Sequence, residues 1–169
     1  MPAVVLINPK YLHNVAAAIR ACSCFGVDTL FWTGTRVNPS AYERLPREER
    51  MKGYREVQWR NTEKPFDLLG EMSPVCVELL PSSSNLSTFT HPERAVYVFG
   101  PEDGGVPKAV RKLCHNFIFI PAYHCLNLAA AMNVVLYDRF VKLSQPVWKP
   151  SDVLRENRGE IAMPGWEGK

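Results

Sequence analysis

Three separated segments of this chain each combine a polar side chain with a turn or a run of small residues. They span residues 8–26, 99–107 and 118–138. An arginine, a glutamate and an asparagine stand out in them, in this order: Arg20, Glu102 and Asn127. Each segment has the pattern of a strand end that runs into a loop or a helix. Because ligands in open α/β sheets bind beyond the carboxyl ends of strands, the three segments predict one composite site.

The second segment is a Gly-rich turn, FGPEDGGVP, that follows the expected strand Ala95–Val98. Glycines let a ligand approach the backbone closely, and Pro107 suits the first turn of a helix. The chain has no G-x-G-x-x-G after its first strand and no Gly-Lys-Ser/Thr phosphate loop, so both nucleotide-binding fingerprints are missing. Taken alone, this turn is as often structural as it is ligand-binding.

The third segment repeats the design, with a strand Phe117–Ile120, a loop and a helix that starts near Asn127. Asn127 by itself suits a helix cap, and Arg20 by itself suits a solvated helix arginine. The helix that carries Arg20 otherwise turns small apolar residues towards the protein. We therefore expect the Arg20 guanidinium to reach past the helix edge.

Short apolar runs bounded by Gly, Pro, Asn or charged residues predict the strands. They are Ala3–Ile7, Thr29–Trp32, Val57–Trp59, Val75–Val77, Ala95–Phe99 and Phe117–Ile120. A stripe of core-facing residues predicts the first helix: Val15, Ala18, Ile19, Cys22 and Phe25. Asn14 is expected to cap its start and Gly26 to end it. Alternating strands and helices predict an α/β fold, a mainly parallel sheet with helices on both faces.

The helix Asn127–Val141 is apolar on nearly every face between Leu128 and Leu136, interrupted only by Asn133. A helix that is apolar all round needs burial all round. In a chain of this size the sheet can cover one side and a second subunit the other. The pattern therefore predicts a homodimer packed through this helix, with a central helix of a monomer as the alternative.

The composition of the chain limits the class of protein. Its 169 residues, of which 46% are hydrophobic and 22% charged, fit one globular domain. We expect this domain over residues 1–147 and a tail extension over 148–169. No apolar run reaches the roughly 18 residues of a membrane span. Because the amino terminus shows no cleavage signal, a cytoplasmic location is expected.

The five cysteines lie mostly in apolar segments, as reduced core thiols do. The Cys–His pairs at 114–115 and 124–125 lack zinc-finger spacing, so no metal is expected.

The formal net charge of +3 is too small to indicate nucleic-acid binding by itself, but basic residues crowd one stretch. They are Arg36, Arg44, Arg47, Arg50, Lys52, Arg55, Arg60 and Lys64, interleaved with Tyr42, Tyr54 and Trp59. Phosphate contacts combined with base stacking are the usual means of holding loop RNA. Because acidic residues are mixed in, a solvated, salt-bridged helix fits part of the stretch equally well.

Together the motifs resemble the SpoU/TrmH branch of the SPOUT methyltransferases. The first motif of that branch is an Asn followed six residues later by an Arg, here Asn14 to Arg20, closed by Phe25-Gly26. The second is a Gly-x-Glu-x-x-Gly turn, here at residues 100–105. The third is Ile-Pro, a short loop and Ser-Leu-Asn, here at residues 120–127. The resemblance runs from residue 1 to about 147, and the chain is similar in length to minimal members that methylate the tRNA wobble ribose.

The resemblance implies a fold, a cofactor and a reaction. The fold carries a C-terminal deep trefoil knot, although knots are nearly absent among proteins. The cofactor is S-adenosylmethionine (SAM), the protein is a homodimer, and a methyl group passes to a ribose 2′-hydroxyl of RNA. The implied substrate is tRNA, with rRNA as an alternative. A catalytically silent, knotted RNA-binding dimer is the alternative from another class.

The resemblance also implies roles for particular residues. The cofactor-binding set is Glu78, Gly100, Ile120, Cys125 and Leu126, and the catalytic set is Arg20, Asn14, Glu102 and Asn127. A guanidinium is a poor base because its pKa exceeds about 12, so Arg20 is expected to bind an RNA phosphate and stabilise the charge that develops on the hydroxyl. Two positions depart from the family pattern: Ala16 replaces a Gly and Cys125 replaces a Ser. A thiol is a weaker hydrogen-bonding group than a hydroxyl, so Cys125 is expected to reduce activity or alter the substrate if the hydroxyl contributes to the reaction.

Overall fold

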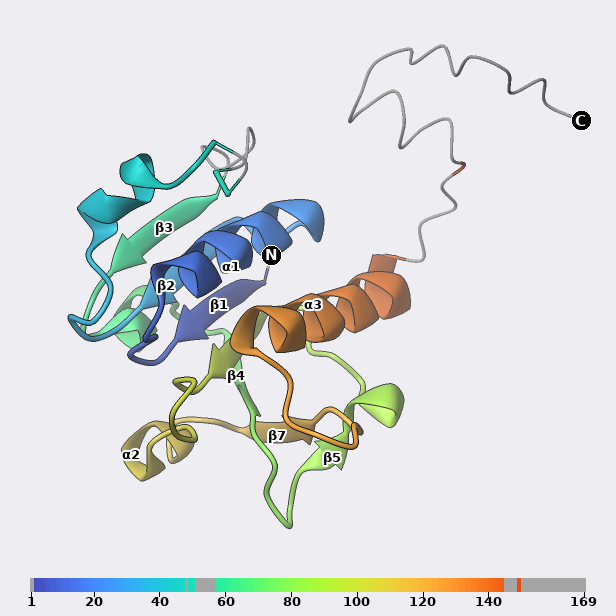
Figure 1. Ribbon diagram of the computed structural model, residues 1–169. Helices are drawn as coiled ribbons and strands as arrows, with labels where there is room; N and C mark the ends of the chain where they lie inside the picture. Colours follow the sequence, from blue (N-terminus) through green and yellow to red (C-terminus); the bar gives the residue numbers. More distant parts are fainter. Residues whose placement is uncertain (1, 48, 51–56, 145–148, 150–169) are drawn as a thin grey trace, which may run out of the picture.

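The computed structural model describes residues 2–47, 49–50, 57–144 and 149, and it shows an α/β fold built on one seven-stranded sheet (Figure 1). The order of strands in the sheet is β3-β2-β1-β6-β4-β7-β5, and all six neighbouring pairs run parallel. The strands are β1 Ala3–Leu6, β2 Thr29–Trp32, β3 Gln58–Asn61, β4 Ser73–Val77, β5 Ser84–Asn85, β6 Ala95–Phe99 and β7 Asn116–Phe119. The helices are α1 Leu12–Cys24, α2 Lys108–Arg111 and α3 Leu128–Ser144, with 3-10 turns η1 Pro39–Arg44, η3 Pro65–Leu68 and η4 Leu86–Thr88.

The predicted strands are confirmed to within two residues at either end. β2 and β6 have the predicted bounds, and β4 begins two residues before the predicted start. The central strands are buried on both faces, which is why their sequences are continuous apolar runs and not alternating ones. β5 was not predicted because it is a two-residue edge strand of polar residues, Ser84 and Asn85.

Two apolar layers cover the sheet. α1 and α3 pack side by side on one face, where Val4 and Leu6 of β1 point (Figure 1). The other face, reached by Ala3 and Val5 of the same strand, is covered by residues of η3 and α2. The prediction of helices on both faces is confirmed, although the second face has only short ones.

The start of α1 differs from the prediction. Tyr11, not Asn14, occupies the N-cap position, and among the described residues no side chain caps this end. Asn14 lies in the first turn of the helix and is buried, and its amide is available for other partners. At the other end Gly26 has a φ of 67°, the left-handed conformation that commonly stops helices, so its predicted role is confirmed.

The helix α3 divides into a covered and an uncovered side. Met132, Val135 and Leu136 face the core, whereas Val134 and Tyr137 are exposed. The chain itself therefore covers about half of this apolar helix. The homodimer predicted to cover the rest stays a prediction, as does the trefoil knot.

Three further expectations concern the cysteines, membrane-spanning helices and the C-terminal tail. All five cysteines are free, and three of them are buried: Cys22, Cys76 and Cys114. No described helix has the length and apolar character needed to cross a membrane. The proposed tail, residues 148–169, lies outside the described residues except for Lys149.

Candidate functional site

A cavity of about 660 Å³ opens beyond the carboxyl ends of β4, β6 and β7. Its walls come from the loops that follow these strands, within residues 77–79, 99–105 and 119–128, and from Ala131 of α3. This volume lies in the usual range of roughly 300–1,000 Å³ for small-molecule sites. The five predicted cofactor residues all line it: Glu78, Gly100, Ile120, Cys125 and Leu126. The second and third motifs therefore meet at one cavity, and the role of these residues in cofactor binding stays a prediction.

The Gly-rich turn after β6 leaves no room for a side chain at Gly100 or at Gly105. A Cβ on Gly100 would lie 2.7 Å from the backbone nitrogen of Val106, and a Cβ on Gly105 would lie 2.6 Å from Oε2 of Glu78. The same Glu78 oxygen accepts a 2.7 Å hydrogen bond from the Val106 N–H. Glu78 thus holds the loop closed with one oxygen. This contact is a structural role for Glu78 beyond the predicted one in cofactor binding.

The three motifs are joined by a chain of amide and carboxylate contacts. Asn127 donates through Nδ2 to Oδ1 of Asn14 at 3.2 Å, and Asn14 donates through Nδ2 to Oε1 of Glu102 at 2.6 Å. Asn127 also caps α3, because its Oδ1 accepts from the N–H of Ala129 at 2.9 Å. Three of the four predicted catalytic residues therefore lie together, with Glu102 lining the cavity, and Asn127 has the capping role that was its alternative. Their catalytic roles stay predictions.

The carboxylate of Glu102 has partners on both oxygens. Its Oε2 accepts the backbone N–H of Lys10 at 2.8 Å, opposite the Asn14 contact. Partial burial raises the pKa of Glu102, but hydrogen bonds from Asn14 and from the Lys10 backbone outweigh this and hold the pKa below its ordinary value. An ionised carboxylate with both oxygens engaged suits a loop anchor better than a proton acceptor.

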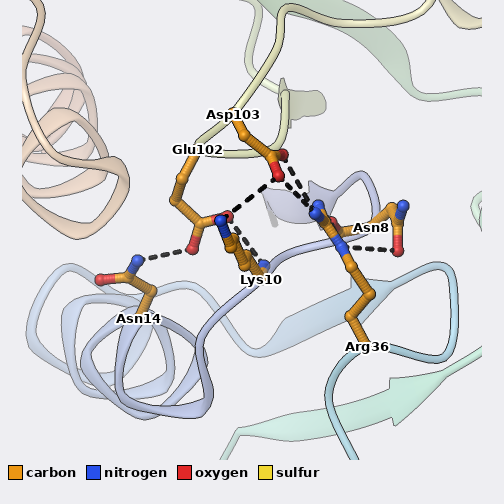
Figure 2. A network of polar contacts seen from close by, with 6 residues as sticks. All are labelled: Asn8, Lys10, Asn14, Arg36, Glu102 and Asp103. Atoms are coloured by element: carbon orange, nitrogen blue, oxygen red, sulfur yellow. Dashed lines mark hydrogen bonds and ion pairs between the residues drawn. The ribbon is translucent and has the colours of Figure 1, made fainter.

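Arg36, which precedes η1, extends this network (Figure 2). Its Nη1 donates to both oxygens of Asp103, at 3.0 and 2.8 Å, and its Nε donates to the backbone oxygen of Asn8 at 3.1 Å. The Lys10 ammonium lies 3.7 Å from Asp103. The Arg36 guanidinium holds the pKa of Asp103 below its ordinary value. No local sequence pattern indicates this use of Arg36, because its partners are 28 and 67 residues away.

Arg20 occupies a different face of α1 from Asn14. Six residues of α-helix advance about 9 Å and rotate by roughly 240°. The exposed Arg20 shares its face with His13 and Cys24, which are also exposed. The expectation that its guanidinium extends past the helix edge agrees with this exposure, but Arg20 is not among the residues that line the cavity.

The third loop leaves several side chains open to solvent. Cys125 is exposed and Leu126 is 41% exposed, while Ile120 at the end of β7 is half-buried. Tyr123, on the same cavity wall, is fully exposed. Tyr123 was not predicted to belong to the site, although its place between Ile120-Pro121 and Asn127 is a signal that the sequence contains.

The basic stretch packs differently from the RNA-stacking prediction. Tyr42 is 1% exposed, and its ring lies 5.2 Å from that of Trp59, which in turn stacks on Trp32 at 5.8 Å. The Tyr42 ring is therefore part of the core and cannot stack on a base, so its predicted role in RNA binding is wrong. Trp59 is half-buried in the same aromatic cluster.

The cations of that stretch fall into three groups. Arg36 and Arg50 form ion pairs, the latter with Glu43 at 3.3 Å, as the salt-bridged alternative expected. Arg60 lies over the ring of Phe31. Exposed positions remain at Arg44, Arg47 and Lys64, whereas Lys52, Tyr54 and Arg55 lie outside the described residues.

A second polar network lies inside the protein beside α3. The buried His91 contacts the Tyr97 hydroxyl through Nδ1 at 2.6 Å and Asp138 through Nε2 at 2.8 Å. Lys142 lies 2.7 Å from the same Asp138 oxygen and donates to the backbone oxygen of Leu86. This network joins α3 to β6 and η4, and it was not predicted because its members lie far apart in the sequence.

Comparisons with known proteins point to one family and one fold. The model of the SpoU rRNA Methylase family matches residues 1–137. The A. aeolicus TrmH/SpoU tRNA modifying enzyme aligns with a TM-score of 0.69 at 20% identity, over 92% of this chain and 84% of that one. An AdoMet-bound rRNA methyltransferase from Sinorhizobium meliloti gives 0.72 at 21% identity, over 84% of this chain and 56% of that one.

A structure described as giving insights into the 2-OH methylation of C/U34 on tRNA aligns with a TM-score of 0.71 at 21% identity, over 86% of this chain and 98% of that one. A search of curated proteins gave no match. At these identities the structural likeness shows the fold, and the predicted mainly parallel α/β architecture is confirmed.

Proposed function

Since the chain belongs to the SpoU rRNA methylase family, we propose that it transfers a methyl group from SAM to a ribose 2′-hydroxyl of RNA, with tRNA as the substrate. The observation that carries the proposal is the chain of contacts from Asn127 through Asn14 to Glu102 at the edge of the cavity. It brings the three family motifs, up to 113 residues apart, to one place. The similar length of the structure concerned with C/U34 on tRNA favours tRNA over rRNA.

The residues around the cavity fit SAM as the cofactor. The bare backbone of Gly100 and Gly105 allows a close approach, and the exposed apolar side chain of Leu126 offers a surface for an adenine ring. Cys125 lies on the same wall, and its backbone groups do not depend on whether the side chain is a thiol or a hydroxyl. When bound, SAM supplies a methyl group already activated by its sulfonium.

The remaining tasks are alignment of the ribose and stabilisation of charge. Alignment can contribute about 7–11 kcal/mol in favourable cases. Asn14, Glu102 and Asn127 hold the two cavity loops in a fixed relation. Arg20 binds an RNA phosphate and stabilises the negative charge that develops on the 2′-oxygen. Replacing Arg20 by Ala should abolish transfer and leave SAM binding nearly intact.

A homodimer packed on α3 gives Arg20 a route to a cavity. Val134, Tyr137 and Val141 form an exposed apolar strip, and α1 packs beside α3. We propose that a second subunit on this strip also meets the exposed face of α1, and that Arg20 of each subunit serves the cavity of the other.

Mixed dimers test this arrangement. Arg20→Ala protein combined with Gly105→Ala protein, whose cavity loop is disrupted, should recover part of the transfer activity. Recovery requires Arg20 to act across the dimer. If both variants are inactive alone and inactive together in confirmed mixed dimers, Arg20 acts within its own subunit.

The overall proposal is tested by incubating the protein with methyl-labelled SAM and total RNA, then mapping the modified nucleotide. Label on a tRNA ribose supports the proposal, and label on rRNA changes the substrate. Label on a base contradicts 2′-O transfer. RNA binding without transfer favours the silent RNA-binding dimer, the outcome that the Cys125 departure would explain.

A further inference from the structure

Arg36 lies outside the three motifs and yet contacts two of the segments that carry them (Figure 2). One side of its guanidinium donates to Asn8 through Nε, at 3.1 Å to the backbone oxygen and 3.2 Å to Oδ1, and its Nη2 also donates to that backbone oxygen. The other side donates to both carboxylate oxygens of Asp103. Asn8 leads into the first motif, and Asp103 follows Glu102 in the second. Arg36 therefore bridges the two segments with one rigid, planar group.

The backbone that carries Arg36 is itself held firmly. Gly34, with a φ of 79°, donates its N–H to Glu63 at 3.0 Å and accepts from Asn61 at 2.8 Å. The side chain of Asn8 fills the space beside Gly34, where a Cβ would lie 2.2 Å from Oδ1. Asn8 also donates its N–H to Thr33 at 3.0 Å. The guanidinium thus projects from a fixed support at the end of β2 and β3.

Charge at this position argues against a free phosphate site. Two cations, Lys10 and Arg36, face two carboxylates, Glu102 and Asp103, within one network. The four formal charges cancel. The Arg36 side chain is 30% exposed and that of Asp103 is 47% exposed, so the ion pair contributes little through charge alone. What a two-sided guanidinium adds is geometry, because its donors fix the direction of both loops.

We propose that Arg36 is a positioning residue, which holds the Gly-rich turn at the correct distance from the first motif and so keeps the cavity in its SAM-binding form. Arg36 acts on this turn through its hydrogen bonds to Asp103, the residue next to Glu102. The reference to SAM rests on the proposed function; the effect of Arg36 on the loop does not.

The decisive variant is Arg36→Lys, which keeps the charge and removes the two-sided geometry. We expect roughly a five- to tenfold loss of SAM affinity by calorimetry without RNA. Asp103→Ala should give a similar loss, and the double variant should be no worse than either single one. The matched control is Arg50→Lys, the same change in the exposed ion pair with Glu43, and it should leave SAM affinity unchanged.

A second readout does not depend on the cofactor. Amide hydrogen exchange at Lys10 and Val106 reports the hydrogen bonds that these N–H groups donate to Glu102 and Glu78. Arg36→Lys should speed exchange at both amides and leave the melting temperature close to that of the wild type. If the wild type binds no SAM, the proposed function fails, but the exchange result still decides the role of Arg36.

A direct role in RNA binding predicts the opposite pattern. Arg36→Lys would then keep SAM affinity and exchange rates unchanged, and Asp103→Ala would strengthen RNA binding by removing a negative charge. Additive losses of SAM affinity in the double variant would also overturn the proposal, because residues that act through each other are not additive.

Discussion

Asn127 serves two helices with the two ends of one amide: its Oδ1 caps α3 through the N–H of Ala129, and its Nδ2 donates to Asn14 within α1. The start of α3 is therefore fixed directly to the residue that binds Glu102. An ionised Asp, which only accepts, would keep the cap but could not make the second contact. The structural and functional interpretations of Asn127 describe the same side chain.

Substitutions of Asn127 should separate these two contacts. Asp keeps the capping oxygen but loses the donor to Asn14, so Asn127→Asp should retain stability and lose methyl transfer. Ala loses both, and a lost cap costs about 1 kcal/mol, or roughly 2–4 °C of melting temperature in a chain of this size. Melting curves and transfer assays on both variants give the comparison.

Asn38 provides the control for this pair, because its Oδ1 accepts from the N–H of Ser40 at the start of η1, away from the cavity. Asn38→Asp should change neither stability nor transfer appreciably. Full activity in Asn127→Asp would show that the contact with Asn14 is dispensable.

Adjacent glycines in the cavity loop should respond differently to the same methyl group. In Gly105→Ala the Cβ would lie 2.6 Å from the Glu78 carboxylate, so either that carboxylate or the loop must move. In Gly104→Ala the nearest atom is Cγ of Pro101 at 3.8 Å, an ordinary contact. We expect SAM affinity to fall at least about tenfold in the first variant and to stay near wild type in the second. Equal SAM affinities in the two variants would mean that Glu78 does not determine the conformation of the loop.

The sequence predicted the parts of the site that depend on local pattern. Strand ends and Gly-rich turns are encoded by neighbouring residues, so the cavity walls were found with their residues, Gly100 and Ile120 among them. The role of Arg36 was missed because it depends on how a distant loop packs against Asn8. Asn14 was taken for the N-cap because the helix start was placed too late; the N-cap position is Tyr11, three residues before Asn14. Tyr42 was predicted to stack on RNA bases because an aromatic residue among cations has the same sequence pattern whether its ring faces the core or the solvent.

The exposed side of α3 predicts how the subunits associate. Tyr137 is 58% exposed in a helix whose other side is core, and a charge there should oppose burial against a second subunit. Tyr137→Glu should shift the protein from dimer to monomer in analytical ultracentrifugation. Leu113→Glu is the control, since Leu113 is 51% exposed just after α2. A wild-type monomer at all accessible concentrations would contradict the proposed dimer.

His91 should make the stability of the protein depend on pH near neutrality. Burial lowers the pKa of His91 below its ordinary value of 6.5, although the hydrogen bond with Asp138 opposes this, and Lys142 and Arg139 disfavour a further positive charge. The folded protein therefore binds fewer protons at this position than the unfolded chain does. The free energy of unfolding should fall as the pH drops from about 7 through 6.5 towards the lower folded pKa.

Urea unfolding between pH 5 and 8 measures this dependence. His91→Gln removes the titrating group, so the variant should be less stable at pH 8 but should lose less stability on acidification than the wild type does. His115→Gln is the matched control, because His115 is exposed and its substitution should leave the wild-type pH dependence in place.

The neutral His91 ring satisfies both neighbours when Nε2–H donates to Asp138 and the Tyr97 hydroxyl donates to Nδ1. A parallel loss of stability in wild type and His91→Gln would show that the proton is taken up elsewhere.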